Sequence, residues 1–241
     1  MIRFTLLAIV SLFLIFACQE EGKEIFVETS LEEVDDRLIE DEGIKAFLQP
    51  YKDSLSIIMD SVIGYSSQHL VKKQPESLLG NFMLDATLNY AISKAWVDST
   101  SPTLAMMNIG GLRAPIDKGD ITIGAIYKLM PFDNLVVIAK MPSSALADIY
   151  RYNKETGGQP IAGFKIEGED LLPLGFEEFG DTIELITTDY LFNGGDRMDF
   201  FQAAYAHKNT GVLLRDVLID YVVEKDTIRV ELDNRINFGD E

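Results

Sequence analysis

Apolar residues recur at helical spacing in two stretches of the chain. The first stretch begins at about Ile44 and continues through Phe47, Tyr51, Leu55, Ile58, Met59 and Val62. The second follows Gly80 and contains Met83, Leu84, Ala86, Leu88, Ala91, Ile92 and Trp96. A spacing of three to four residues places such side chains on one face of a helix. We therefore predict two helices, the first amphipathic and the second with its apolar stripe in the core.

Shorter apolar runs bounded by turn residues indicate strands. Residues 103–107 and 135–139 are two such runs, and residues 164–166, 182–188 and 227–232 follow in the second half. Ser143 and Ser144 are placed to begin a helix that runs through Tyr150, with a serine as its cap. A further helix is predicted from about Gly211 to Val223. Because helices and strands interleave without strict alternation, the pattern favours an α+β fold.

The N-terminus has the features of an export signal. Arg3 is followed by uncharged residues 4–17 and then by Cys18, the only cysteine of the chain. This segment is too short to span a bilayer, which takes about 20 residues, but it suits a signal peptide over residues 1–17. The residues before Cys18 resemble the lipobox of bacterial lipoproteins, which implies cleavage before Cys18 and lipidation of its sulfur. A buried core cysteine is the alternative.

Charge separates a tether from the folded part. Eleven carboxylates fall between Gln19 and Glu42, against only Lys23 and Arg37, so we expect residues 18–43 to be a solvated acidic tether and residues 44–241 to form the domain. The formal net charge of −18 excludes polymeric nucleic acid as a partner but not a small nucleotide held by focused arginines. The expected location is the bacterial cell envelope, lipid-anchored at the outer membrane on its periplasmic or surface side.

The usual residues of metal-dependent phosphoester hydrolysis are not apparent. Such chemistry takes a cluster of His, Asp and Asn ligands around one or two ions. The chain has two histidines, His69 and His207, and neither has a histidine partner at ligand spacing. There is also no nucleophile elbow and no phosphate-binding loop. We expect no metal site, no cofactor and no catalytic residue in this chain.

Three loops combine glycines with polar or aromatic residues. They are residues 74–81 (QPESLLGN), residues 108–113 (NIGGLR), which are followed by residues 130–134 (MPFDN), and residues 189–196 (DYLFNGGD). A glycine pair lets the backbone turn and approach a ligand closely. Arg113 suits a phosphate or carboxylate oxygen, and Asp196 suits a pair of hydroxyls such as those of a ribose.

Phe132 and Tyr190 stand close to these polar groups in the sequence. Aromatic rings there can clamp a flat ring, since base–aromatic stacking contributes roughly 1–3 kcal/mol per base. Taken alone, each feature has a plain structural alternative. A Gly-Gly turn beside a strand is usually only a turn, and a lone Phe132 is more often a core residue. The order of the motifs is what favours a site.

Over about residues 71–201 the chain carries five motifs in this order: Glu-Ser-x-Leu-Gly-Asn, Asn-x-Gly-Gly-x-Arg, Gly-Asp-Ile, Pro-Phe-x-Asn and Gly-Gly-Asp. Together they resemble the C-terminal domain of the 5′-nucleotidase/UDP-sugar hydrolase family. The resemblance implies a four-layer α/β/β/α fold and a nucleoside bound between two aromatic rings. It implies these substrate-binding residues: Phe132 and Tyr190 as the rings, Asn134 toward the base, Arg113 and Asn108 near the phosphate and ribose, Asp196 with Gly195 at the ribose hydroxyls, and Lys73 where the family often has an arginine.

Two classes of function follow from this reading. In the first, the chain recognises the nucleotide while a separate exported metallophosphatase supplies the divalent metals, so that the chain alone is inactive. In the second, it is a non-catalytic surface lipoprotein that captures nucleosides or nucleotide sugars. A third possibility is a scaffold whose clamp no longer binds.

Overall fold

The computed structural model describes residues 30–31, 38–98 and 100–239. The predicted signal peptide, Cys18 and most of the acidic tether lie outside the described residues. The chain divides into two units, Met1–Phe47 and Leu48–Glu241. Within the described ranges, no helix combines the length and the apolar character that a membrane span requires.

A five-stranded sheet organises the second unit, with strand order β5-β2-β8-β4-β9. Its strands are β2 (Thr103–Met106), β4 (Leu135–Pro142), β5 (Ile161–Ala162), β8 (Thr182–Thr188) and β9 (Ala206–Leu213). β2 and β8 are parallel, and every other neighbouring pair is antiparallel. This mixed sheet, together with its helices, confirms the predicted α+β fold class.

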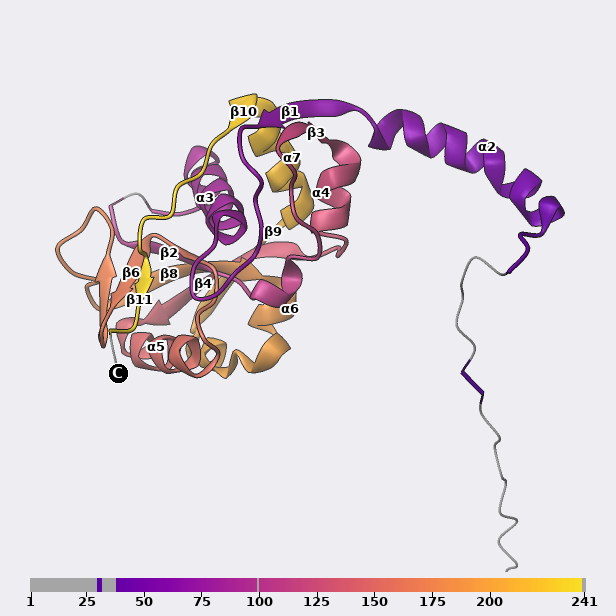
Figure 1. Cartoon of the computed structure of the whole chain (residues 1–241). Coiled ribbons are helices and arrows are strands. Elements are labelled where there is room, and N and C mark those ends of the chain that lie inside the picture. The colour runs from indigo at the N-terminus through magenta and orange to yellow at the C-terminus, as the bar shows by residue number, and fades with distance from the viewer. Residues whose placement is uncertain (1–29, 32–37, 99, 240–241) are drawn as a thin grey trace, which may run out of the picture. The chain divides into compact units, whose positions relative to one another are not determined.

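Helices cover both faces of this sheet (Figure 1). α3 (Leu78–Ser93) and α7 (Leu214–Lys225) lie on one side, and α5 (Leu146–Glu155) lies on the other. Among the described residues, the remaining helices are α2 (Glu42–Met59), α4 (Ile123–Leu129), α6 (Asp189–Phe192) and the short turns η1 (Ile109–Gly111), η2 (Ser143–Ala145), η3 (Gly195–Arg197) and η4 (Asp199–Ala203).

Two small sheets complete the unit. One has the order β10-β1-β3, formed by β1 (Val62–Ser66), β3 (Gly119–Thr122) and β10 (Thr227–Ile228). The other has the order β11-β6-β7, formed by β6 (Phe164–Glu167), β7 (Asp170–Pro173) and β11 (Ile236–Asn237). Both sheets pair strands that are far apart in the sequence, so they fasten the C-terminal segment to the rest of the domain.

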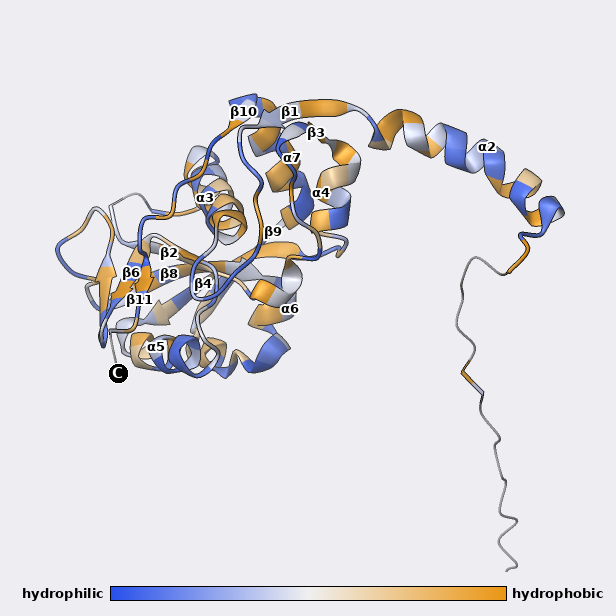
Figure 2. Ribbon diagram, in the orientation of Figure 1, coloured by the Kyte–Doolittle hydropathy of each residue, from blue (hydrophilic) through white to orange (hydrophobic). Residues whose placement is uncertain are grey.

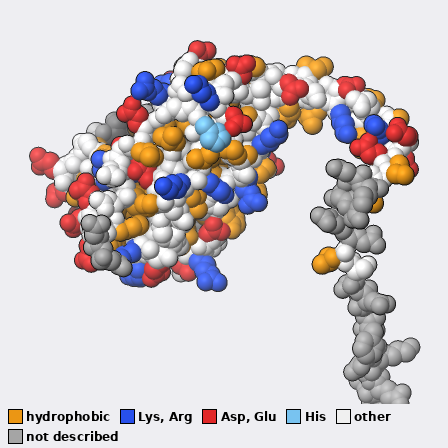
Figure 3. Space-filling model, in the orientation of Figure 1, with side chains coloured by type: hydrophobic (Ala, Val, Ile, Leu, Met, Phe, Trp, Pro, Cys, Tyr) orange, Lys and Arg blue, Asp and Glu red, His pale blue; other side chains and the backbone are white. Residues whose placement is uncertain are grey.

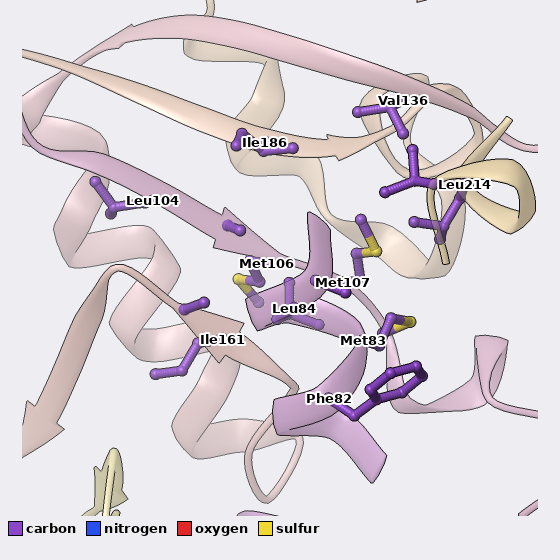
Figure 4. Close-up of a cluster of buried hydrophobic side chains, with 14 of the residues drawn as sticks. Phe82, Met83, Leu84, Leu104, Met106, Met107, Val136, Ile161, Ile186 and Leu214 are labelled. Atoms are coloured by element: carbon purple, nitrogen blue, oxygen red, sulfur yellow. The ribbon is translucent and has the colours of Figure 1, made fainter. Parts of the chain in front are cut away.

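The main core lies where α3 meets the central strands (Figure 4). Leu84 and Met83 of α3, Leu104 of β2 and Ile186 of β8 are all fully buried. In the hydropathy colouring of Figure 2, hydrophobic residues are frequent on α3, α7 and β6, whereas α5 is largely hydrophilic on the side drawn. Burial of each such side chain contributes roughly 1.5–3 kcal/mol, so the sheet and its helices form a rigid support.

The predicted helix after Gly80 is observed as α3. Its cap is Ser77, whose hydroxyl accepts a hydrogen bond from the backbone amide of Gly80 at 3.0 Å. The predicted strands at 103–107, 135–139, 164–166 and 182–188 correspond to β2, β4, β6 and β8. The first predicted helix is α2, which ends at Met59 because Val62 belongs to β1, and none of its residues is buried.

Three expectations about local structure were wrong. Neither Ser143 nor Ser144 caps a helix, because both lie in η2 and α5 begins at Leu146 without a side-chain cap. The helix expected from Gly211 begins at Leu214, because the mostly polar residues before it form the exposed edge strand β9. The strand expected over residues 227–232 is observed only as β10, which ends at Ile228, and the amide of Val230 instead donates to Oε1 of Gln68 at 2.9 Å.

Candidate functional site

A cavity of about 350 Å³ opens at one edge of the five-stranded sheet. It is lined by Asn108, Gly110, Gly111, Arg113, Phe132, Asn134, Tyr190 and Asp196. These residues follow the carboxyl ends of the parallel strands β2 and β8, or precede the amino end of β4, which runs antiparallel to β8. All three ends meet at the same edge of the sheet, which is where open α/β sheets commonly hold ligands. We call this cavity the edge pocket.

Six of the predicted binding residues line the edge pocket together: Asn108, Arg113, Phe132, Asn134, Tyr190 and Asp196. Gly195 is not part of the lining but lies against Tyr190, since a Cβ on Gly195 would stand 2.5 Å from ring atom Cε1 of Tyr190. Lys73 is exposed and outside the lining. The loop that precedes α3 contributes the Ser77 cap rather than a pocket wall.

The two aromatic residues are both exposed at the pocket. Phe132 is 40% exposed and Tyr190 is 48% exposed, so the alternative that Phe132 is a core residue does not hold. The guanidinium carbon of Arg113 lies 6.0 Å from the Phe132 ring centroid, at the outer range of a cation–π contact. Arg113 thus brings a planar charged donor to the wall that carries an accessible ring.

Asp196 is the centre of a hydrogen-bonded polar wall of the edge pocket. Its Oδ2 accepts a hydrogen bond from Nδ2 of Asn108 at 2.5 Å, and its Oδ1 accepts one from the Tyr190 hydroxyl at 2.9 Å. Its backbone carbonyl accepts a third from the Tyr152 hydroxyl at 2.9 Å. The hydrogen bond to Asp196, and the charge of that carboxylate, raise the pKa of Tyr190 above its usual value. Burial, and then the same charge, raise the pKa of Tyr152.

Asp189 joins the two loops that carry the aromatic rings. Its Oδ1 accepts hydrogen bonds from the backbone amides of Leu135, at 3.0 Å, and of Tyr190, at 2.9 Å. One carboxylate oxygen therefore fixes the start of β4 and the start of α6 relative to each other. Sequence reasoning placed Asp189 in the third loop motif but assigned it no role, because its partner at Leu135 is distant in the sequence.

Arg215 supports the loop of Phe132 from beneath. It is 7% exposed, and its guanidinium donates to Asp133 at 2.8 Å and to the carbonyl of Phe132 at 3.4 Å. The guanidinium also lies 4.2 Å from the ring centroid of Tyr127. Arg215 was not among the predicted site residues, although a charged residue among the apolar positions of a predicted helix is a signal for a buried ion pair.

A buried polar pair supports the loop of Asn108. Oε1 of Gln159 accepts a hydrogen bond from the amide of Ile109 at 2.8 Å, and the amide of Gln159 donates to Oδ1 of Asn153 at 3.0 Å. Both side chains are buried, so each hydrogen bond satisfies a group that would otherwise be costly to desolvate. Neither residue was predicted, and no local motif marks them.

The two histidines lie in unrelated surroundings. Nδ1 of His69 pairs with Asp117 at 2.9 Å, and the ring of His207 lies 4.6 Å from that of Phe192. In the part of the chain that the structure describes, no three His, Cys, Asp or Glu side chains are grouped to hold a metal ion.

Acidic and basic side chains are interspersed over the face shown in Figure 3. The edge pocket therefore offers stacking surfaces, one arginine and one carboxylate as its binding chemistry.

The chain is similar in sequence to a known protein family and to several of its relatives. Residues 62–171 match the family model described as "5'-nucleotidase, C-terminal domain". The chain is 25% identical over 233 residues to the trifunctional nucleotide phosphoesterase protein YfkN of Bacillus subtilis, covering 85% of this chain and 15% of that protein. It is 26% identical over 250 residues to an apyrase of Anopheles gambiae, covering 90% of this chain and 42% of the apyrase.

Solved structures share the fold. The 5′-nucleotidase precursor of Thermus thermophilus aligns with a TM-score of 0.67 at 24% identity, over 82% of this chain and 43% of that one. The NAD nucleotidase of Haemophilus influenzae aligns with a TM-score of 0.61 at 16% identity, over 81% of this chain and 41% of that one. The chain thus spans less than half the length of each of these relatives. The chain shares the fold of their matching domain, and its residues 62–171 match the 5′-nucleotidase C-terminal domain family.

Proposed function

We propose that the edge pocket binds a nucleoside or nucleotide. The observation that supports this most strongly is the convergence of two exposed aromatic rings, Arg113 and Asp196 on one cavity of about 350 Å³. That volume lies within the usual range for small-molecule sites, about 300–1,000 Å³. A nucleotide combines a flat base, a vicinal diol and an anion, and the pocket has a matching group for each of them.

In this proposal the base stacks between Phe132 and Tyr190, with Asn134 at its edge. Asp196 accepts hydrogen bonds from the ribose hydroxyls, while Asn108 and Gly195 hold Asp196 and Tyr190 in place. Arg113 receives the phosphate through its planar fork of donors. Lys73 is exposed and outside the lining, and its proposed role at the phosphate rests only on its place in the sequence motif.

Hydrolysis is proposed to depend on a separate metallophosphatase subunit that brings the divalent metals. The groups that line the edge pocket bind the substrate's ground state, and binding alone does not lower the barrier to phosphoester cleavage. We further propose that the chain is exported and anchored in the bacterial envelope through lipid on Cys18. Replacement of Cys18 by Ser should then move the protein from the membrane fraction to the soluble fraction.

Titration calorimetry with adenosine, AMP and UDP-glucose tests the binding proposal. Phe132→Ala and Tyr190→Ala should each weaken nucleoside binding by roughly 5- to 150-fold, the loss expected when one stacking partner is removed. Tyr205→Ala is the matched control, because Tyr205 is exposed and donates to Thr182 away from the edge pocket. If the control and the two pocket variants behave alike, the residue assignment is wrong.

A turnover assay separates the partner proposal from the binding proposal. The purified chain with Mn²⁺ or Zn²⁺ should leave AMP intact, and addition of the metallophosphatase subunit should start hydrolysis. Turnover by the chain alone at ordinary enzyme rates, about 1–10³ s⁻¹, would remove the need for a partner and leave the pocket assignment standing. Binding of AMP without any partner that restores turnover would favour the non-catalytic surface lipoprotein.

A further inference from the structure

Both carboxylate oxygens of Asp196 already have one donor each. Oδ1 accepts from the Tyr190 hydroxyl at 2.9 Å, and Oδ2 accepts from Asn108 at 2.5 Å. The two donors approach from different loops, one after β8 and one after β2. The carboxylate is therefore held in one orientation before any ligand arrives.

The surroundings of Asp196 fix it further. Its backbone has a φ of 51°, in the left-handed region, and the Tyr152 hydroxyl donates to its carbonyl at 2.9 Å. The ring of Tyr190 occupies the space beside Gly195, where a Cβ would meet ring atom Cζ at 2.6 Å. The Tyr190 hydroxyl is thus placed by ring packing and by its hydrogen bond together.

The remaining acceptor capacity of Asp196 matches a vicinal diol. An ionised carboxylate has about two acceptor positions on each oxygen, so one position per oxygen is left after Tyr190 and Asn108 have bonded. We propose that the Tyr190 hydroxyl makes the edge pocket selective for ribose over 2′-deoxyribose, by holding Asp196 with one acceptor free for each of the 2′ and 3′ hydroxyls. This inference rests on the proposed nucleoside function and adds a specificity determinant to it.

A 2′-deoxyribose leaves one of these acceptor positions without its partner. Because Tyr190 is half exposed, water replaces part of the lost hydrogen bond, and the preference is modest rather than absolute. A single hydrogen bond to a charged group at such a site is expected to give about a tenfold preference for the ribonucleoside. Without the Tyr190 hydroxyl, Oδ1 of Asp196 loses its donor and Asn108 alone holds the carboxylate, so we expect the fit to two hydroxyls to weaken while stacking is kept.

The test compares the dissociation constants of adenosine and 2′-deoxyadenosine in the full chain and in Tyr190→Phe. The intact protein should prefer adenosine by about tenfold. Tyr190→Phe should bind 2′-deoxyadenosine as before and lose most of its preference for adenosine. Tyr205→Phe, which removes an exposed hydroxyl outside the pocket, should leave both constants unchanged.

The ratio of the two constants decides the outcome. An equal loss for both nucleosides in Tyr190→Phe would show that the hydroxyl only positions the ring, and would overturn the inference. An unchanged ratio would overturn it as well. If the intact protein binds neither nucleoside, the proposed function itself fails, and the two failures are thus distinguished. Thermal unfolding of each variant confirms that the fold is intact before the constants are compared.

Discussion

The side-chain amide of Asn108 donates a 2.5 Å hydrogen bond to the carboxylate of Asp196, across 88 positions of sequence. The bond is possible because β2 and β8 are parallel neighbours, so the residues that follow them emerge at the same edge of the sheet. The edge pocket is thus a consequence of sheet topology. Its polar wall is assembled from two loops that local sequence does not connect.

Asp196→Asn tests the polar wall. The substitution keeps the shape of the side chain but removes its charge and replaces one acceptor oxygen by a donor. Adenosine binding should weaken by roughly tenfold or more, because hydrogen bonds to a charged acceptor are stronger than those to a neutral one. Calorimetry gives the affinity, and a melting curve serves as the folding control. Affinity equal to that of the intact protein would remove Asp196 from the site.

Gly195→Ala tests whether the Tyr190 ring must lie against the glycine. The added methyl would meet the ring at 2.5 Å and the carbonyl of Tyr190 at 2.6 Å. Overpacking of this kind costs about 1–3 kcal/mol and should displace the ring. We expect a lower free energy of unfolding in urea and at least a fivefold loss of adenosine affinity.

Gly194→Ala is the matched control for Gly195→Ala. No atom lies within 4 Å of its Cβ position, but its φ of 90° is unfavourable for a side chain. The left-handed backbone should cost about 1–2 kcal/mol of stability, with adenosine affinity preserved because the ring is untouched. A larger loss of binding in Gly194→Ala than in Gly195→Ala would contradict the proposed role of the glycine.

Arg215→Met tests the support beneath Phe132. Methionine fills the buried space of the side-chain stem but loses the hydrogen bonds to Asp133 and to the carbonyl of Phe132. Unfolding should become easier by about 1–3 kcal/mol, and adenosine affinity should fall because the ring is less well placed. Asp133→Asn is the control. Because the Asp133 side chain is exposed, water can accept the hydrogen bond of Arg215 in its place, and we expect a smaller loss of stability and of affinity than in Arg215→Met. Destabilisation without any loss of affinity would make Arg215 a purely structural residue.

The pH dependence of stability should report on Asp233. Arg235 is 6% exposed and donates to Asp233 from Nε at 2.9 Å and from Nη2 at 3.1 Å. Burial acts to raise the pKa of Asp233, but the hydrogen bonds and charge of Arg235 outweigh it and hold that pKa below its usual value. A lowered folded-state pKa stabilises the fold above the unfolded-state pKa, about 3.9, and this stabilisation is lost as the pH falls through the folded-state value.

Asp233→Asn should therefore lower the free energy of unfolding at pH 7 by only about 0.5–1 kcal/mol, because the Asp233 side chain is 42% exposed and solvent screens its interaction with Arg235. The difference from the intact protein should stay constant between about pH 5 and 7 and shrink below about pH 4. Urea unfolding of the intact protein and of Asp233→Asn across this pH range measures the size of the difference and its pH dependence. A difference that grows with acid would mean that the carboxylate does not stabilise the fold through Arg235.

The sequence alone predicted the elements and loops whose evidence lies within a short stretch of residues. α3 and β8 were predicted from periodicity and apolar runs, because their side chains enter the core around Leu84 and Ile186. The six pocket-lining residues were found because they lie in short motifs, and the structure places those motifs at one edge of the sheet.

Local signals did not reveal features that depend on distant partners. Within the described residues β9 pairs with β4 alone, at the edge of the sheet, and its mostly exposed side chains follow no alternating apolar pattern. Arg215 and Gln159 support the pocket through contacts with Phe132 and Ile109, which are more than forty positions away in each case. Such contacts become visible only when the strands are arranged in space.

A crystal structure of the protein with AMP would show where each part of the nucleotide binds. We expect the base between Phe132 and Tyr190, the ribose hydroxyls within hydrogen-bonding distance of Asp196, and the phosphate toward Arg113. AMP bound away from the edge pocket, or in the pocket with its base outside the two rings, would contradict it.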